Sequence, residues 1–225
     1  MENDRKRAFK DEVYDQFARI GKAFSSASRL ELIDVLAQRE RTVEALAEET
    51  GMSVANTSRH LQVLKGDRLV RRRKDGTRAY YTLAGPEVYR AWKAMRGLAE
   101  SRLAEIEDTV RRYLSDREQL EPISTSELHA RLERDDVVVL DVRPEAEYRN
   151  GHIPGARSVP VDRLEDHLES LPDDKEIIAY CRGPYCIYSD DAVRRLRAAG
   201  HDARRLEEGL PDWAADGRPV EKTGA

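Results

Sequence analysis

Cysteine is scarce in this sequence, since only two occur among its 225 residues, at positions 181 and 186. Two neighbouring cysteines cannot form the multi-disulfide framework of a small secreted protein. Long apolar runs are also lacking: no stretch approaches the ~18 residues of a membrane-spanning helix, and the N-terminus has no signal-peptide core. We therefore expect a cytoplasmic protein that does not associate with a membrane.

The composition is that of a soluble globular protein, with 36% charged and 40% hydrophobic residues. The length allows two small domains. A net charge of −4 disfavours nucleic-acid binding, but the charge is unevenly spread. Residues 1–121 carry 24 Lys and Arg against 21 Asp and Glu, whereas residues 122–225 carry 15 against 22.

One basic cluster lies in the first half of the chain. Residues 53–78 hold eight Lys and Arg side chains and only two Asp. Such local clustering is the electrostatic footprint of a phosphate-binding face. A solvated surface patch would give the same count, so the assignment also needs a structural pattern.

Apolar spacing predicts mostly helices in the first half. A first helix has one apolar stripe from Phe9 to Phe24, and a second follows residue 26. Thr42 and Ser53 are expected to cap two short helices, the first of which ends at Gly51. The apolar stripe of these helices consists of Leu30, Ile33, Leu36 and Ala37 in the second helix and Val54, Ser58, Leu61 and Leu64 in the last.

Residues 69–83 have strand character, with a turn at 74–76. One long helix is predicted over about 86–113. Its apolar side is longer than a small domain needs, which favours a dimer contact over packing within the monomer.

The second half has a different pattern. The runs 137–142 and 176–180 are short and almost continuously apolar, as in strands buried on both faces. They alternate with helical segments at 124–134, 162–170 and 189–199, which is typical of an α/β domain with a mostly parallel sheet. After the charged stretch 115–121, Pro122 marks a boundary, so we predict domains over 1–118 and 122–225.

Short helix, tight turn, second helix and basic hairpin together predict a winged helix-turn-helix. Its recognition helix needs polar, forked side chains for base edges and phosphates, and its wing needs cations. For His60 a structural role is the alternative. The expected DNA-binding residues are Ser53, Asn56, Thr57, Arg59, His60, Arg72, Arg73, Lys74 and Arg78.

These residues resemble the ArsR/SmtB family of bacterial repressors. The resemblance rests on SASRLELIDVL (26–36), TVEALAEETGMSVANTSRHLQVL (42–64) and RLVRRRKDGTRAYYTL (68–83). It implies a homodimer, built on the first and last helices, that binds a palindromic DNA operator. Many members hold metals through cysteines or a final-helix histidine, but this chain has no Cys before 181 and no His over 86–117. We therefore expect no metal site and no cofactor.

The segment EIIAYCRGPYC predicts a buried strand that leads into a six-residue loop and then a helix. Backbone N–H groups and the helix dipole favour a thiolate or persulfide anion at Cys181, and Arg182 next to it would add positive charge. The alternative is an inert buried thiol.

This half resembles single-domain rhodaneses, a sulfurtransferase family. The resemblance rests on LDVRPEAEYRNGHIPGARSVP (140–160), the cysteine loop, EEGLPDW and GRPV. It implies that Cys181 accepts sulfane sulfur and that the loop residues Gly183, Pro184 and Tyr185 help to cradle its anion. It also implies that Asp141 and Arg143 brace the loop, and that His152 belongs to a structural turn.

Two positions depart from the rhodanese pattern, Cys186 at the end of the loop and Leu210 in the motif after Gly209. We expect Cys186 to lie close enough to Cys181 to form a disulfide or a bridging polysulfide with it. The alternative is that Cys186 only packs in the interior. We therefore predict a repressor that senses reactive sulfur, with a sulfane-sulfur donor as its small-molecule partner. The rivals are a sulfurtransferase carried on a DNA-binding module and a thiol-based oxidant or arsenite sensor.

Overall fold

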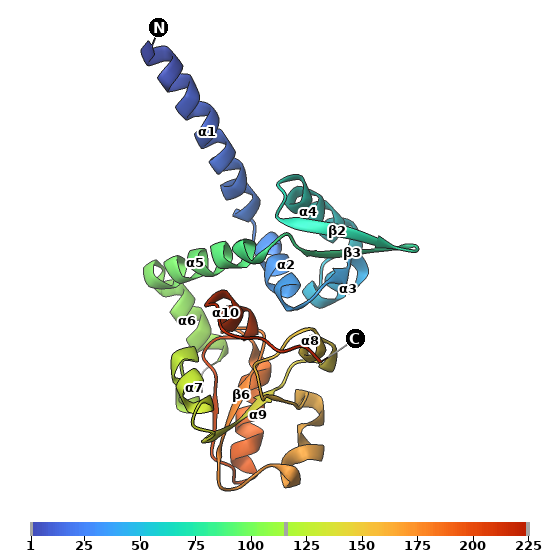
Figure 1. Cartoon of the computed structure of the whole chain (residues 1–225), viewed down its shortest axis with the longest axis vertical. Helices are drawn as coiled ribbons and strands as arrows, with labels where there is room; N and C mark the ends of the chain where they lie inside the picture. The colour runs from blue at the N-terminus through green and yellow to red at the C-terminus, as the bar shows by residue number, and fades with distance from the viewer. Residues whose placement is uncertain (1, 115–116, 224–225) are drawn as a thin grey trace. The chain divides into compact units, whose positions relative to one another are not determined.

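The structure, a computed structural model, describes residues 2–114 and 117–223, so Ser115 and Asp116 of the predicted boundary stretch lie outside the described residues. The chain forms two compact units, residues 1–94 and 95–225, that divide within helix α5 (Figure 1). The sequence-based boundary between 118 and 122 stays a prediction. No helix in the described ranges is both long and apolar enough to span a bilayer.

The first unit is a winged helix-turn-helix, which confirms the predicted fold. Its strands form an antiparallel sheet in the order β1-β3-β2, and β2 and β3 make the wing. The predicted caps are confirmed, because Thr42 and Ser53 accept hydrogen bonds from Ala45 N and Asn56 N, and Gly51 ends its helix at a φ of 66°. The elements are α1 (Glu2–Phe24), α2 (Ala27–Gln38), β1 (Arg41–Thr42), α3 (Val43–Thr50), α4 (Val54–Gly66), β2 (Val70–Asp75), β3 (Arg78–Leu83) and the start of α5 (Pro86–Arg102).

Helix α1 exposes most of its predicted apolar stripe. Phe9, Phe17 and Ile20 are 66%, 65% and 40% exposed, and only the last turn of α1, at Ala23 and Phe24, is buried. Within the first unit, the stripe therefore has no apolar partner over most of its length.

The predicted single helix over 86–113 is wrong. Helix α5 ends at Arg102, Leu103 is extended, and α6 (Ala104–Tyr113) begins after it. The charges fit this break, since a basic Arg102 suits the end of one helix and Glu105 and Glu107 suit the start of the next.

The second unit contains an α/β domain with a parallel four-stranded sheet in the order β5-β4-β6-β7. The predicted buried strands are confirmed as β4 and β6, which lie in its centre. Its elements after α6 are η1 (Arg117–Leu120), α7 (Thr125–Leu132), β4 (Val137–Asp141), α8 (Glu145–Asn150), β5 (Arg157–Ser158), η2 (Val161–Ser170), β6 (Glu176–Tyr180), α9 (Ile187–Ala198), β7 (Ala203–Arg205) and α10 (Leu210–Ala215).

The sheet separates two apolar cores because successive strand side chains point to opposite faces. Val138, Leu140 and Cys181 lie in a core with α9 and η2, whereas Val139 and Tyr180 lie in a core with α7 and α10. Cys181 thus follows the carboxyl end of a central strand, with protein on both sides.

Candidate functional site

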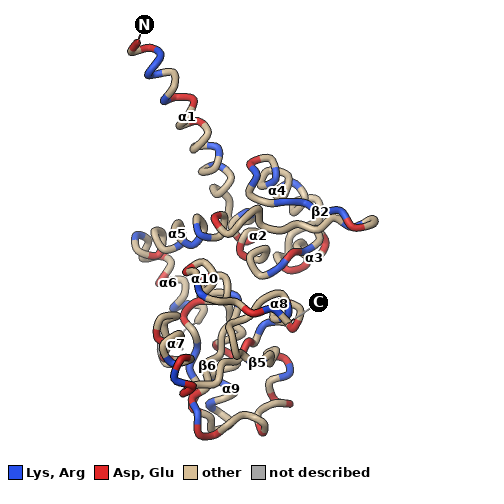
Figure 2. Tube along the Cα trace, in the orientation of Figure 1, with Lys and Arg blue, Asp and Glu red and all other residues tan. Residues whose placement is uncertain are grey.

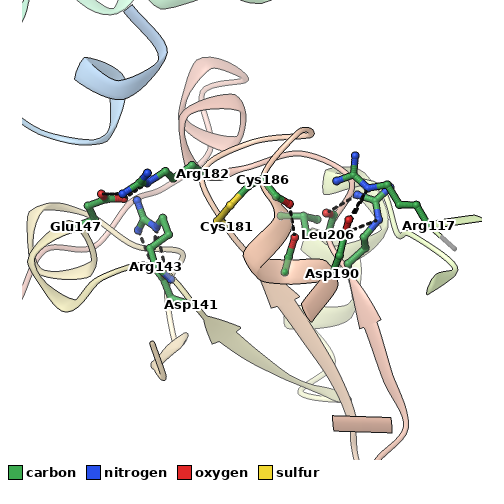
Figure 3. Close-up of a disulfide and its surroundings, with 11 residues drawn as sticks. Arg117, Asp141, Arg143, Glu147, Cys181, Arg182, Cys186, Asp190 and Leu206 are labelled. Carbon is green, nitrogen blue, oxygen red and sulfur yellow. Dashed lines mark hydrogen bonds and ion pairs between the residues drawn. A yellow bond between two sulfur atoms is a disulfide. The ribbon is translucent and has the colours of Figure 1, made fainter. Parts of the chain in front are cut away.

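Cys181 and Cys186 are joined by a disulfide across the loop between β6 and α9 (Figure 3). Their Cα atoms lie 6.2 Å apart, within the reach predicted for this pair. In this structure Cys186 is bonded to Cys181 as well as packed against the core, and its role as a resolving thiol stays a prediction. Cys181 is 2% exposed, whereas Cys186 is partly exposed and precedes the first residue of α9.

The loop between the cysteines turns on itself. The backbone N–H of Cys186 donates to the carbonyl of Gly183 at 3.1 Å, so this amide is engaged within the loop. Gly183 and Pro184 are half-buried, and Tyr185 is 45% exposed. That the amides of 182–186 cradle a sulfur anion stays a prediction, and Pro184 has no N–H to contribute.

The expectation that Arg182 places its charge beside the sulfur is wrong. Its guanidinium points to Glu147 of α8, with Nη2 2.7 Å and Nε 3.0 Å from the two carboxylate oxygens (Figure 3). Glu147 is fully buried, and a buried carboxylate requires a charged or hydrogen-bonding partner. The demand of that carboxylate therefore decides the orientation of Arg182.

Asp141 and Arg143 connect the end of β4 to the residue before Cys181. The Arg143 guanidinium donates to Asp141 and to the carbonyl of Gly151, and the Tyr180 hydroxyl donates to Asp141 at 2.5 Å. Burial, and the negative charge of Asp141, raise the pKa of Tyr180, so its hydroxyl remains a donor. Burial opposes the charge of Arg143, but the hydrogen bonds and charge of Asp141 outweigh it and raise the Arg143 pKa.

His152 belongs to the turn that these residues hold. It is 5% exposed, its ring stacks on Tyr148 at 3.8 Å between centroids, and its Nδ1 forms a 3.0 Å hydrogen bond with the Tyr148 carbonyl. These contacts fit the predicted structural role.

A buried cationic cluster behind Cys186 was not predicted. Arg117 and Arg205 both face Asp190, in the first turn of α9, with Nε–carboxylate distances of 3.0 and 3.6 Å. Each of the three side chains is at least nine-tenths buried. Burial and the positive charge of the nearby Arg117 together lower the pKa of Arg205 to about 10. Two guanidiniums thus share one carboxylate. Arg117 and Asp190 lie on the Cys186 side of the disulfide (Figure 3).

In the winged unit, most predicted DNA-binding side chains reach the surface. Figure 2 shows Lys and Arg along α4 and β2, where Arg59, Arg72 and Lys74 are exposed. Asn56 and His60 are half-buried, and burial together with Arg29 and Arg59 lowers the pKa of His60, which favours its neutral form. Ser53 and Arg78 are exposed as well.

Two predictions for this unit need correction or refinement. Thr57 is fully buried, and its hydroxyl donates to the Ser53 carbonyl at 3.0 Å, so the expected phosphate contact is wrong. Thr57 shares the buried face of α4 with Leu61 and Leu64, whereas Val54 at the helix start is 49% exposed.

Arg73 of the wing is exposed but forms ion pairs with Glu40 at 2.7 Å and with Asp75 at 3.1 Å. Those hydrogen bonds raise the pKa of Arg73.

Two family models match the chain. "Bacterial regulatory protein, arsR family" matches residues 26–72, and "Rhodanese-like domain" matches 124–216. The HTH-type transcriptional regulator Rv0324 of Mycobacterium tuberculosis is 42% identical over 98% of this chain and 95% of its own length.

The chain belongs to the ArsR family of regulators and carries a rhodanese-like domain.

More partial matches accompany this full-length one. A sulfurtransferase of Allochromatium vinosum is 29% identical over 44% of this chain and 92% of its own length. The solved homodimeric winged helix-turn-helix domain Mb0332 of Mycobacterium bovis is 45% identical, covers 42% of this chain and 87% of its own, and has a TM-score of 0.40. Among residues 2–114 and 117–223 of this ArsR-family regulator, no group of three or more His, Cys, Asp or Glu side chains could hold a metal ion.

Proposed function

We propose that this ArsR-family regulator senses reactive sulfur species through Cys181 and Cys186 and changes its affinity for operator DNA in response. The observation that carries the proposal is the pair of cysteines at the two ends of one loop, close enough to bond. A rhodanese that turns over steadily needs one persulfide-bearing cysteine, whereas a second cysteine in reach removes the persulfide.

The chemistry balances without an added oxidant. The Cys181 thiolate attacks the sulfane sulfur of a donor such as thiosulfate, a persulfide forms, and sulfite leaves. The Cys186 thiol then attacks the inner sulfur of that persulfide, the Cys181 Sγ atom. The Sγ–Sγ bond forms, sulfide leaves with the proton of Cys186, and the sulfane sulfur is thereby reduced as the two thiols are oxidised.

The electrostatic surroundings support an anionic sulfur in this loop. The loop leads into the N-terminus of α9, where unpaired N–H groups favour negative charge. The cluster of Arg117 and Arg205, with its one carboxylate, adds positive charge on the same side. We propose that this cluster, rather than Arg182, supplies the cationic influence that the sequence led us to expect.

For the DNA-binding half, we propose that the recognition helix reads an operator palindrome through Asn56, Arg59 and His60. Arg72, Lys74 and Arg78 of the wing, and Ser53 at the start of the helix, would contact the sugar-phosphate backbone. A homodimer through α1 accounts for its exposed apolar stripe and for a palindromic site. Modification of the cysteines would release the DNA, with a coupling of about 1–3 kcal/mol.

The test uses reduced full-length protein and a DNA fragment selected by that protein from a random-sequence library. Polysulfide should convert the cysteines to the disulfide, release sulfide and weaken binding to the fragment, and dithiothreitol should restore it. In Cys186→Ser the persulfide should persist on Cys181. A Cys181→Ser protein that responds to polysulfide like the wild type would refute the sensing role.

The enzyme-class alternative is a sulfurtransferase carried on a DNA-binding module, which the rhodanese-like domain and the Allochromatium relative favour. Rapid thiocyanate formation from thiosulfate and cyanide, with DNA affinity indifferent to sulfur loading, would support that alternative. Peroxide and arsenite can be applied in the same DNA-binding assay. A response to either of them in place of polysulfide would indicate an oxidant or arsenite sensor.

A further inference from the structure

The cysteine loop is connected to the C-terminal half of α5, a helix that lies outside the rhodanese match at 124–216. The Tyr185 hydroxyl, in the loop, donates to a carboxylate oxygen of Glu100 at 2.6 Å. Burial, and this hydrogen bond to Glu100, raise the pKa of Tyr185, so the hydroxyl keeps its proton. Residues 95–102 belong to the same compact unit as the loop.

A second connection runs through Arg96. Its Nη2 lies 2.7 Å from Asp212, and its Nε lies 3.5 Å from Glu100. Asp212 is fully buried and accepts a hydrogen bond from the backbone N–H of Gly209 at 3.1 Å. A buried carboxylate with these two partners fixes the position of both.

Gly209 connects this network back to the cysteine loop, because it packs directly on the loop. A Cβ added at this position would collide with the main-chain atoms of Arg182 and Gly183. The path from Tyr185 through Glu100, Arg96 and Asp212 to Gly209 thus begins at a residue of the cysteine loop and ends at a residue that packs on it. We call Arg96, Glu100, Tyr185 and Asp212 the Arg96 network.

We propose that Arg96 and Glu100 are positioning residues for the cysteine loop, and that the Arg96 network couples the redox state of Cys181 and Cys186 to α5. The proposal rests on the proposed function only in taking these two cysteines as the reactive pair. The disulfide fixes Cys186 relative to Cys181, and Tyr185 is the residue next to Cys186. Reduction removes that constraint and with it the fixed approach of Tyr185 to Glu100.

Thermodynamic linkage gives the direction in which the network shifts the disulfide–dithiol equilibrium. The network is formed in the disulfide state, so it stabilises that state more than the dithiol state if the loop relaxes on reduction. Removing a member should therefore make the disulfide easier to reduce. Helix α5 begins in the winged unit at Pro86, so a change in its last turns has a direct covalent route toward the DNA-binding elements.

The experiment measures the equilibrium of full-length protein with reduced and oxidised glutathione. Tyr185→Phe should shift the protein toward the dithiol by about 5-fold or more, the lower end of typical couplings. Tyr188→Phe is the matched control, since it removes a hydroxyl two residues beyond Cys186 and outside the network. Arg96→Lys should shift the equilibrium in the same direction. Arg96 is buried, so this variant can fail to fold, and the result for the partly exposed Tyr185→Phe then decides the test.

A second measurement reads α5 itself. Amide hydrogen exchange over residues 95–102 should be faster in reduced than in oxidised wild type, and this difference should vanish in Tyr185→Phe. An unchanged glutathione equilibrium in Tyr185→Phe, or an equal shift in Tyr188→Phe, would overturn the proposal. If these shifts appear while Cys181→Ser still answers polysulfide on DNA, the sensing function fails and the coupling stands.

Discussion

The guanidinium of Arg182 lies 2.7 Å from the carboxylate of Glu147, so the cation next to Cys181 in the chain is bound to α8. Glu147 is fully buried and Arg182 is mostly buried, with 16% of its side chain exposed. The pair ties the cysteine loop to the segment that follows β4. This buried ion pair therefore helps to hold the loop in place.

Arg182→Ala should destabilise the protein by about 3–5 kcal/mol, because the buried carboxylate loses both hydrogen bonds from the guanidinium. Arg182→Ala combined with Glu147→Gln should recover part of that loss, since no buried charge then remains at position 147. Urea unfolding of the single and double variants measures this. Arg149→Ala, which removes an exposed partner of Glu145, should leave the transition almost unchanged. Equal losses in Arg182→Ala and Arg149→Ala would contradict the structural role of the pair.

Gly209→Ala should displace the cysteine loop, because the added methyl group would meet main-chain atoms that no side-chain rotation can move. We expect a destabilisation of about 1–3 kcal/mol and slower formation of the Cys181–Cys186 disulfide. Gly183→Ala is the control within the loop itself, since its added Cβ has no atom within 4 Å. Thermal unfolding and the rate of disulfide formation by oxidised glutathione report the two effects. Disulfide formation that is equally fast in both variants would argue against the packing role of Gly209.

An incoming thiol should attack Cys186 rather than Cys181. Exchange requires approach to one sulfur along the S–S axis, and Cys181 is almost fully buried while Cys186 is partly exposed. The thiol becomes a mixed disulfide on Cys186, and its proton ends on the Cys181 sulfur that leaves. Oxidised protein treated briefly with glutathione, quenched in acid and alkylated should carry glutathione on the Cys186 peptide.

Trypsin separates the two cysteines at Arg182, so peptide masses give the site directly. Denatured oxidised protein is the control, and both peptides should then carry glutathione. Native protein modified mainly at Cys181 would show that burial does not decide which sulfur reacts.

Glu40→Gln should strengthen binding to DNA of any sequence. Glu40 binds Arg73 of the wing at 2.7 Å, and removing its charge makes this guanidinium more available to a phosphate. We expect the slope of log affinity against log salt concentration to become steeper by up to about 1, the change that one added phosphate contact gives. Fluorescence polarisation with a labelled duplex at several salt concentrations measures the slope, and Glu48→Gln on the exposed side of α3 is the control. An unchanged slope would mean that Arg73 does not reach the DNA.

Local signals in the sequence were sufficient for most of the fold. Caps such as Thr42 and Ser53, the stop at Gly51 and the apolar runs of β4 and β6 act over a few residues, so they can be recognised one at a time. The break at Leu103 was missed because the apolar spacing continues across it. The signal for this break is the charge on either side, with Arg102 at the end of one helix and Glu105 and Glu107 at the start of the next.

The site was harder to predict because its decisive contacts are distant in the chain. The bond of Cys181 to Cys186 spans five residues and could be anticipated, whereas Arg182–Glu147 spans 35 and Arg96–Asp212 spans 116. Nothing in the neighbourhood of Arg182 indicates that a buried carboxylate will compete for its charge. Thr57 shows the same limit within one helix. The spacing of Leu61 and Leu64 is compatible with either Thr57 or Ser58 on the inward face, and the structure buries Thr57.

The position of Arg96, outside the rhodanese match, has a practical consequence for experiments on the isolated domain. A fragment cut at the edges of the rhodanese match keeps Asp212 in its interior but discards the guanidinium that neutralises it. Such a fragment would leave this buried carboxylate without its Arg96 cation and would loosen Gly209, which packs on the cysteine loop. Rate constants and reduction potentials measured on it would describe a different electrostatic environment from the one in the intact regulator.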